Sequence, residues 1–275
     1  MKARIKWTKT GVLRFIGHLD VQRYFHKAIM RAGLPVSFTK GMSPHQMMSF
    51  AAPLGLGMTS EGEYVDVNFD WSYPGEEMLE RLNAVMNEGI SVTQFRQIHD
   101  KEKNCMSVTA AADYLVGFRP GFYHSEAFTK RCSSFFFQET IPILKKTKRS
   151  EKEVDISPMI LEIREYERKN SIMDILAEIE TMDQNENVSE GVIGFEHPFE
   201  GPAGPAIYMK LVTGSAENLK PQLVMEAFCN YLGYEYNPFG FTYHRLETYL
   251  EKDGILQPLG SVGWDVNKPV LPEEK

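Results

Sequence analysis

The chain has 275 residues, of which 43% are hydrophobic and 24% charged, and its formal net charge is −7. This length allows one large domain or two ordinary ones, and the composition is that of a globular protein rather than a disordered or fibrous one. No run approaches the roughly 18 apolar residues of a membrane-spanning helix, and the start, MKARIKWTKTG, lacks the apolar core of a signal peptide. We therefore expect a cytoplasmic protein that has no contact with a membrane.

The three cysteines, Cys105, Cys132 and Cys229, are far apart in the sequence and follow no metal-binding spacing. Dispersed cysteines in odd number predict reduced thiols that pack as small apolar groups. A CxxxCxxC motif is absent, so the chain cannot hold an iron–sulfur cluster with its own cysteines in that manner. We expect this chain to bind no metal and no cofactor.

Positive charge is concentrated at the start of the chain. Residues 1–50 contain nine lysines and arginines but a single acid, Asp20, while the whole chain is acidic. This asymmetry indicates that the N-terminal part binds an anion. The alternative is that the basic and acidic parts neutralise each other in the fold.

Periodicity predicts six elements in the first hundred residues. Residues 2–9 alternate as a strand, and residues 18–32 have the apolar period of an amphipathic helix that ends at Gly33. The other expected elements are strands at 36–39, 63–69 and 90–98 and a helix that starts at residues 74–75 and stops at Gly89. The order strand, helix, strand, strand, helix, strand is that of a ferredoxin-like (split βαβ) domain. We assign residues 1–103 to this domain and residues 99–104 to a polar linker.

The rest of the chain repeats this order less clearly. The expected strands are residues 111–118, 141–146, 159–166, 206–212 and 241–250, and the expected helices are residues 123–137 and 219–232. An acidic stretch at about 167–205 interrupts the pattern and is interpreted as an insertion that is partly helical at 171–181. The sequence thus predicts an α+β fold of two tandem ferredoxin-like domains, of which the second spans residues 106–265.

Three residues of the early stretch could act as acid and base. His18 and Asp20 lie at the predicted start of a helix, where backbone N–H groups favour anions and lower the pKa of a histidine. His45 lies in a loop with Gly41 and Pro44, and the three side chains could converge as a catalytic group or a metal site. The alternatives are that Asp20 caps the helix and that both histidines only form local hydrogen bonds.

A basic surface is the second candidate site. Cations spaced by four residues on the predicted helix could position phosphates, with an aromatic ring to stack a base. The alternatives are a solvated helix face and neutralisation by the acids of the strand at 63–69. The candidate nucleic-acid-binding residues are Arg14, Arg23, Lys27, Arg31, Lys40, Lys146, Lys148 and Arg149.

Residues 14–67 carry a specific pattern. RFIGHLD is followed by RAGLP, a Gly/Pro loop with His45, and SFAAPLGLGMTSEGEYVD. With KRSEKEVDISPMI at 148–160 and HRLETYLEKDGILQPL at 244–259, the chain resembles the radical-SAM-associated protein family. Gly17, Met42, Ser43 and Gln46 depart from the residues usual in that family.

The resemblance implies a function as partner. Members of the family are encoded beside, or fused to, a radical SAM protein and have no established activity. The resemblance implies that the partner enzyme carries the iron–sulfur cluster and S-adenosylmethionine, while this chain recognises its substrate. By analogy of fold, the substrate is RNA, such as tRNA or rRNA. The alternatives are an RNA-processing or RNA-modifying enzyme that uses His18, Asp20 and His45, and a protein–protein adaptor that binds no nucleic acid.

Overall fold

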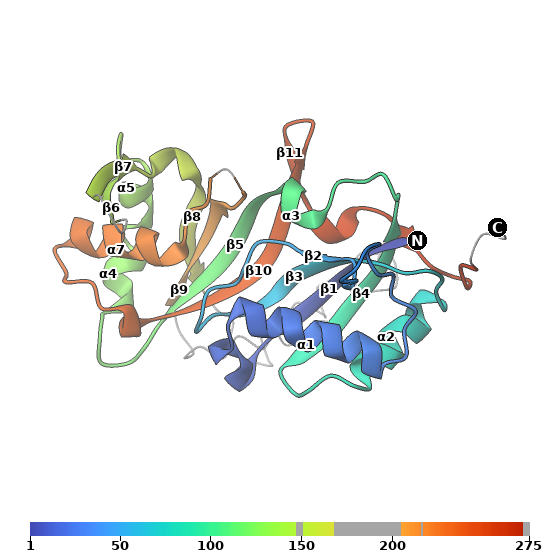
Figure 1. The fold of residues 1–275 in the computed structure, drawn as a ribbon. Helices are drawn as coiled ribbons and strands as arrows, with labels where there is room; N and C mark the ends of the chain where they lie inside the picture. The colour runs from blue at the N-terminus through green and yellow to red at the C-terminus, as the bar shows by residue number, and fades with distance from the viewer. Residues whose placement is uncertain (147–150, 168–204, 216, 272–275) are drawn as a thin grey trace, which may run out of the picture.

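A computed structural model describes residues 1–146, 151–167, 205–215 and 217–271 (Figure 1). The described residues form a mixed α+β fold with one large, mostly antiparallel sheet, a two-stranded sheet and few helices. The predicted insertion at 167–205 lies almost wholly outside the described residues, as do Lys148 and Arg149. None of the helices in the described parts has the length and apolarity to cross a membrane.

The first half of the fold contains the strands β1 to β4. After β1 the chain forms a short 3-10 helix, η1 (Gly11–Phe15), and then α1, and a second helix precedes β4. β1 pairs antiparallel with both β3 and β4, and β2 pairs antiparallel with β3. The elements are β1 (Lys2–Lys9), α1 (His18–Arg31), β2 (Met48–Phe50), β3 (Thr59–Asn68), α2 (Gly75–Asn83) and β4 (Ile90–Ile98).

The second half continues the same sheet, in the order β10-β5-β9-β8, with antiparallel neighbours. Its strands and those of the two-stranded sheet are β5 (Thr109–Phe118), β6 (Pro142–Lys146), β7 (Glu151–Asp155), β8 (Ile160–Glu167), β9 (Pro205–Val212), β10 (Phe241–Lys252) and β11 (Ile255–Pro258). Its helices are α3 (Cys105–Val108), α4 (Ser125–Thr129), α5 (Cys132–Phe136) and α7 (Pro221–Leu232).

A short parallel contact joins the two halves into one sheet. His244 and Arg245 of β10 pair with Thr59 and Ser60 of β3. The strands come so close that a Cβ atom at Gly62 would clash with the backbone of β10 at Leu246 and Glu247. Glycine is therefore required at this position by space rather than by backbone conformation.

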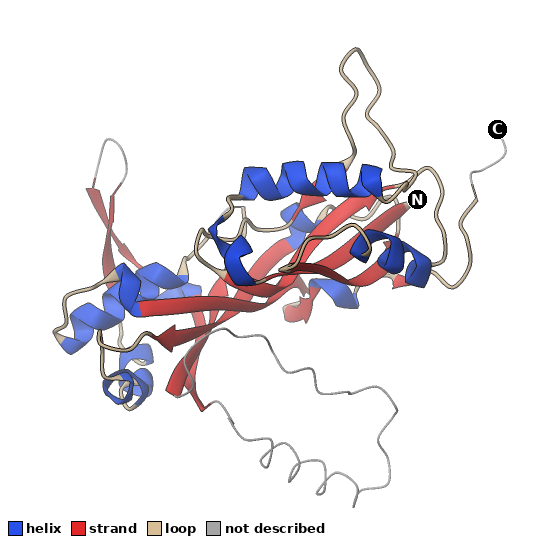
Figure 2. Ribbon diagram, turned by 90° about the horizontal axis from the view of Figure 1, so that it is seen from below, coloured by secondary structure: helices blue, strands red, loops and turns tan. Residues whose placement is uncertain are grey.

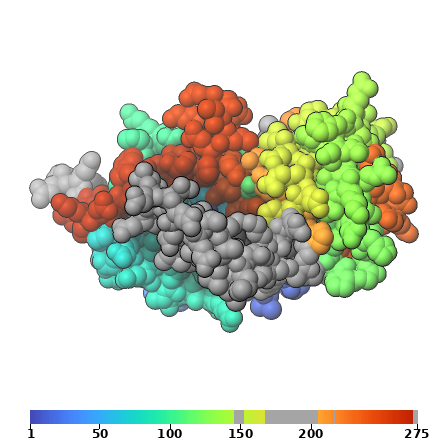
Figure 3. Space-filling model, turned by 180° about the vertical axis from the view of Figure 1, so that it is seen from behind, coloured from blue at the N-terminus to red at the C-terminus, as the bar shows by residue number. Residues whose placement is uncertain are grey.

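The C-terminal segment returns to the first half. β12 (Trp264–Asp265) pairs antiparallel with β4, and Val270 exchanges backbone hydrogen bonds with Ser72. Seen from behind, this segment, drawn in red, runs beside the cyan residues of the first half (Figure 3). The two ends of the chain thus both contribute to the same part of the sheet.

Each half has its own apolar core. In the first half, α1 lies across one face of the sheet (Figure 2) and buries Val21, Phe25 and Ile29 against β1 and β3. In the second half, α7 packs its apolar side, with Phe228 wholly buried, against strands β5, β9 and β10. These apolar sides are the ones that the helical period of the sequence selects.

Several predictions of secondary structure differ from the structure in detail, and the helix expected to stop at Gly89 ends at Asn83. The strand expected at 36–39 forms only isolated bridges, at Val36 and Phe38, and the strand paired with β3 at this edge is β2. The helix expected at 123–137 is two short helices, α4 and α5. The strand β7 was not predicted at all, because its sequence, EKEVD, is mostly charged.

Candidate functional site

The exposed face of α1 carries the predicted basic row. Arg23, Lys27 and Arg31 follow each other at intervals of four residues and are all exposed, because the apolar residues between them face the sheet. Arg23 is paired with Asp20 at 3.2 Å, but both side chains are more than half exposed, so this pair is weak. Arg31 donates to the carbonyl oxygen of Val85 at 3.2 Å. The structure therefore brings three of the predicted phosphate-binding residues together on one helix face.

Four other cations near the start of the chain form ion pairs or hydrogen bonds within the protein. Arg4 forms a buried two-bond pair with Asp66, at 2.8 and 3.0 Å, and Lys6 lies 2.8 Å from Glu247. Lys2 and Lys9 are buried and donate to backbone carbonyl groups of Glu102 and Ile16. The Arg4–Asp66 ion pair confirms that an acid of β3 neutralises a cation of β1. The free positive charge is consequently smaller than the sequence count suggests.

The remaining cations of the predicted basic surface lie apart from the α1 row. Arg14 is half-buried in η1 and stacks over the ring of Phe15, while Lys40 is exposed in the loop after α1. Lys146 ends β6, opposite Glu151 of β7, in the two-stranded sheet of the second half. Lys148 and Arg149 lie outside the described residues.

His18 lies half-buried at the first residue of α1. Its ring meets Phe50 edge-on, and its Nε2 atom lies 3.0 Å from the amide nitrogen of Gln22. Burial lowers the pKa of the His18 imidazole, Glu63 opposes this shift, and the nearby cations Lys9 and Arg245 add to it. The imidazole therefore favours its neutral form.

The three candidate acid–base residues have separate surroundings. His45 is exposed, and its Nδ1 atom lies 3.1 Å from Thr39 Oγ1, while Asp20 accepts from Arg23. Among the described residues no hydrogen bond, ion pair or ring contact joins His18, Asp20 and His45 to one another. Over the same residues, no group of three or more His, Cys, Asp or Glu side chains could hold a metal ion.

A buried polar seam between the halves was not predicted. Arg245 is 2% exposed, and its guanidinium donates to Glu63 at 2.9 Å, to Tyr114 at 3.1 Å and to the carbonyl oxygen of Ala52 at 3.0 Å. His244 is wholly buried, and its Nδ1 atom lies 2.8 Å from Thr59 Oγ1. The signal in the sequence is the charged residues in SEGEY and HR, which lie inside the strands β3 and β10. These residues join β10 to β3 and the loop after β2.

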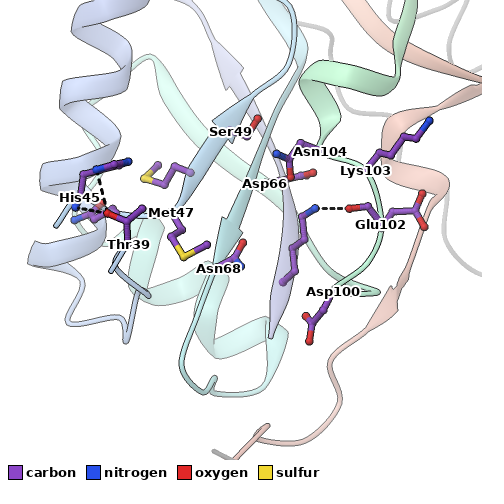
Figure 4. A pocket seen from close by; sticks show the side chains of 13 residues that line it. Thr39, His45, Met47, Ser49, Asp66, Asn68, Asp100, Glu102, Lys103 and Asn104 are labelled. Carbon is purple, nitrogen blue, oxygen red and sulfur yellow. Dashed lines mark hydrogen bonds between the residues drawn. The ribbon is translucent and has the colours of Figure 1, made fainter. Parts of the chain in front are cut away.

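A polar hollow of about 480 Å³ lies at the start of β1 and the end of β3 (Figure 4). The loop that holds His45 forms one side, and the segment from Asp100 to Asn104 forms the other. Gln46 lines this hollow and is hydrogen-bonded to His26 of α1, so the hollow begins where the middle of α1 meets the loop. Of the residues that line the hollow, His45 is the only predicted site residue.

Comparison with curated proteins finds no match to this chain. A family model described as an uncharacterized protein conserved in bacteria, DUF2344, matches residues 2–221. The matched range includes η1, α1, the polar hollow and the Glu63 side of the seam. The chain belongs to this family of uncharacterized bacterial proteins, DUF2344.

Proposed function

We propose that this chain is a non-catalytic partner that binds RNA through the outer face of α1 and presents it to a radical SAM enzyme. The observation that carries the proposal is the exposed row of Arg23, Lys27 and Arg31. The cations of β1 are bound by internal acceptors, so the row on α1 is the part of the basic N-terminal stretch that faces solvent as a continuous surface.

The spacing of the row suits a nucleic-acid backbone. Residues four apart on a helix are neighbours about 6 Å apart, which is close to the distance between successive phosphates of an extended strand. Each phosphate that a lysine or arginine neutralises releases counterions, which makes binding salt-dependent. Three contacts of this kind give modest affinity without reading sequence.

The radical SAM partner rests on the sequence resemblance of residues 14–67. In this proposal the partner enzyme binds the iron–sulfur cluster and S-adenosylmethionine, and this chain supplies substrate recognition. Both proteins would work in the cytoplasm, where RNA substrates are available. The tRNA or rRNA that is recognised would be identified by sequencing the RNA captured with the pair.

The fold proposed for this function is two ferredoxin-like units. In the first half the sheet order is β4-β1-β3 with β2 beside β3, and in the second half it is β10-β5-β9-β8. These strand orders support the proposal, because in the split βαβ arrangement the fourth strand lies beside the first and the second beside the third. The proposed units correspond to residues 1–103 and 106–265.

The direct experiment compares RNA binding by two triple variants. Arg23, Lys27 and Arg31 are changed together to Gln, and the control changes three exposed cations elsewhere, Lys220, Lys252 and Lys268, to Gln. Both variants lose the same net charge. We expect the α1 variant to bind bulk tRNA at least tenfold more weakly at low salt, and the control to bind nearly as well as the native chain. Equal losses in the two variants would reject α1 as the binding face.

A protein adaptor is the second candidate function. Four large apolar side chains are exposed near the start of α1, and the hydrogen bond from Gly57 N to Arg14 O joins η1, which carries two of them, to the loop that carries a third. Exposed apolar side chains that cluster mark protein-binding surfaces. They are Val12, Phe15, Leu19 and Leu56, which are 61 to 78% exposed. Capture of a radical SAM protein from nuclease-treated lysate, lost on changing Phe15 and Leu19 to Ser, would favour the adaptor.

A further inference from the structure

The polar hollow has unused hydrogen-bonding groups. The side chains of Ser49, Asn68, Asp100 and Asn104 all line it, and none of them forms a hydrogen bond within the part of the chain that the structure describes. Asp66, which also lines the hollow, is by contrast hydrogen-bonded to Arg4. A set of unpaired donors and acceptors around one hollow is what a polar ligand requires.

The hollow also has an apolar wall. Met47 and Met48 line it beside the loop of His45, and Met47 is 39% exposed. Figure 4 shows Met47 and Asn68 between the His45 side and the Asp100 side. Methionine side chains adapt to flat surfaces and make favourable contacts with aromatic rings. The lining therefore suits a ligand with flat apolar faces and polar edges.

From this lining we infer that the hollow binds an unpaired nucleobase, with guanine preferred. Its volume is within the usual range for small-molecule sites, roughly 300–1,000 Å³. Guanine offers N–H donors on its Watson–Crick edge and acceptors at O6 and N7. The Asp100 carboxylate accepts from the donors, and the amides of Asn68 and Asn104 donate to the acceptors. Adenine, cytosine and uracil lack the adjacent pair of donors that one carboxylate can take.

The hollow is placed to act together with α1. Gln46 touches both, since it lines the hollow and its side chain bonds to His26, which is next to Lys27 on the helix. A strand whose phosphates lie on α1 can turn round this edge and place one base in the hollow. The inference rests on the proposed RNA binding and names the base that the same surface recognises.

The test uses four nine-nucleotide RNAs with a fluorescent label, all uridine except for the central position. Binding to the full chain is measured by fluorescence anisotropy for central G, A, C and U. We expect central G to bind about tenfold tighter than central U, the gain of one or two hydrogen bonds to a charged group. Asp100→Asn and Asn68→Ala should remove this preference, so that the ratio of the affinities for central G and central U falls to about one. Glu251→Gln, an exposed acid on β10 far along the chain, is the matched control.

A second measurement separates this inference from the proposed function. Guanosine monophosphate is titrated alone, and binding is followed by the NMR signals of the methionine methyl groups. If the oligonucleotides bind without preference and the monophosphate shifts no methionine signal, the inference is overturned while RNA binding stands. If the monophosphate shifts the signals of Met47 and Met48 but no RNA binds, the hollow is a nucleotide site and the proposed function fails. A guanine preference that survives Asp100→Asn also overturns the inference.

Discussion

Removing the acid from the buried seam should destabilise the whole chain. Glu63→Gln leaves the guanidinium of Arg245 buried without its anion, since both side chains are at most 5% exposed. Breaking a buried ion pair from one side costs about 3–5 kcal/mol in general. Arg245 keeps the carbonyl oxygen of Ala52 and the hydroxyl of Tyr114 as acceptors, so we expect the lower end, about 3 kcal/mol of the free energy of unfolding.

The assay is urea unfolding followed by tryptophan fluorescence, with a matched pair as control. Glu77→Gln removes the same group from an ion pair with Arg81 whose side chains are about 40% exposed, and should cost less than about 1 kcal/mol. A double variant, Glu63→Met with Arg245→Met, should lose less stability than its two single variants together. If Glu63→Gln and Glu77→Gln shift the unfolding midpoint equally, the reasoning about the seam is refuted.

Three further outcomes follow from burial. Gly62→Ala should prevent stable folding, because its Cβ would meet backbone atoms of β10. Gly55→Ala should cost less, because its Cβ would meet only side-chain atoms, of Met58 and Gln222; thermal melting compares the two variants. The pKa of His18 is lower in the fold than in the unfolded chain, so the native protein should lose stability as the pH falls below about 6.5. The variant His18→Gln should lose less stability over the same pH range. Parallel curves of unfolding free energy against pH for the two proteins would contradict this. Burial raises the pKa of Cys229 to about 11 and that of Cys132 to about 12, so a thiol reagent should react with no cysteine at pH 8 until urea is added; rapid labelling of the native chain would show that the thiols are accessible.

The apolar period of the sequence was sufficient to predict the helices and strands whose structure depends mainly on residues close in sequence. The predicted strand at 90–98 has the bounds of β4, and the predicted helix at 18–32 differs from α1 by one residue. Both have a clear apolar period, because one face packs on the sheet and the other meets solvent. The basic row of α1 was predictable for the same reason.

Contacts between distant residues could not be predicted in this way. Lys2 and Arg4 of β1 are charged but buried, because Asp66 and the segment after β4 cover them. β2 pairs with β3, and residues 36–39 form only the bridges of Val36 with Phe69 and of Phe38 with Gln46, so the structure of this edge depends on partners outside each segment. The seam and the hollow each combine segments far apart in sequence, so no spacing along the chain reveals them.

The most direct test of RNA binding by α1 is the salt dependence of binding to a single-stranded RNA. The affinity of the native chain and of the variant with Arg23, Lys27 and Arg31 changed to Gln is measured from low to moderate salt. Each phosphate contact on a single strand contributes about 0.7 to the slope of log affinity against log salt. The account predicts that the slope becomes smaller by about 2 in the variant. An unchanged slope, or native binding that does not depend on salt, would contradict it.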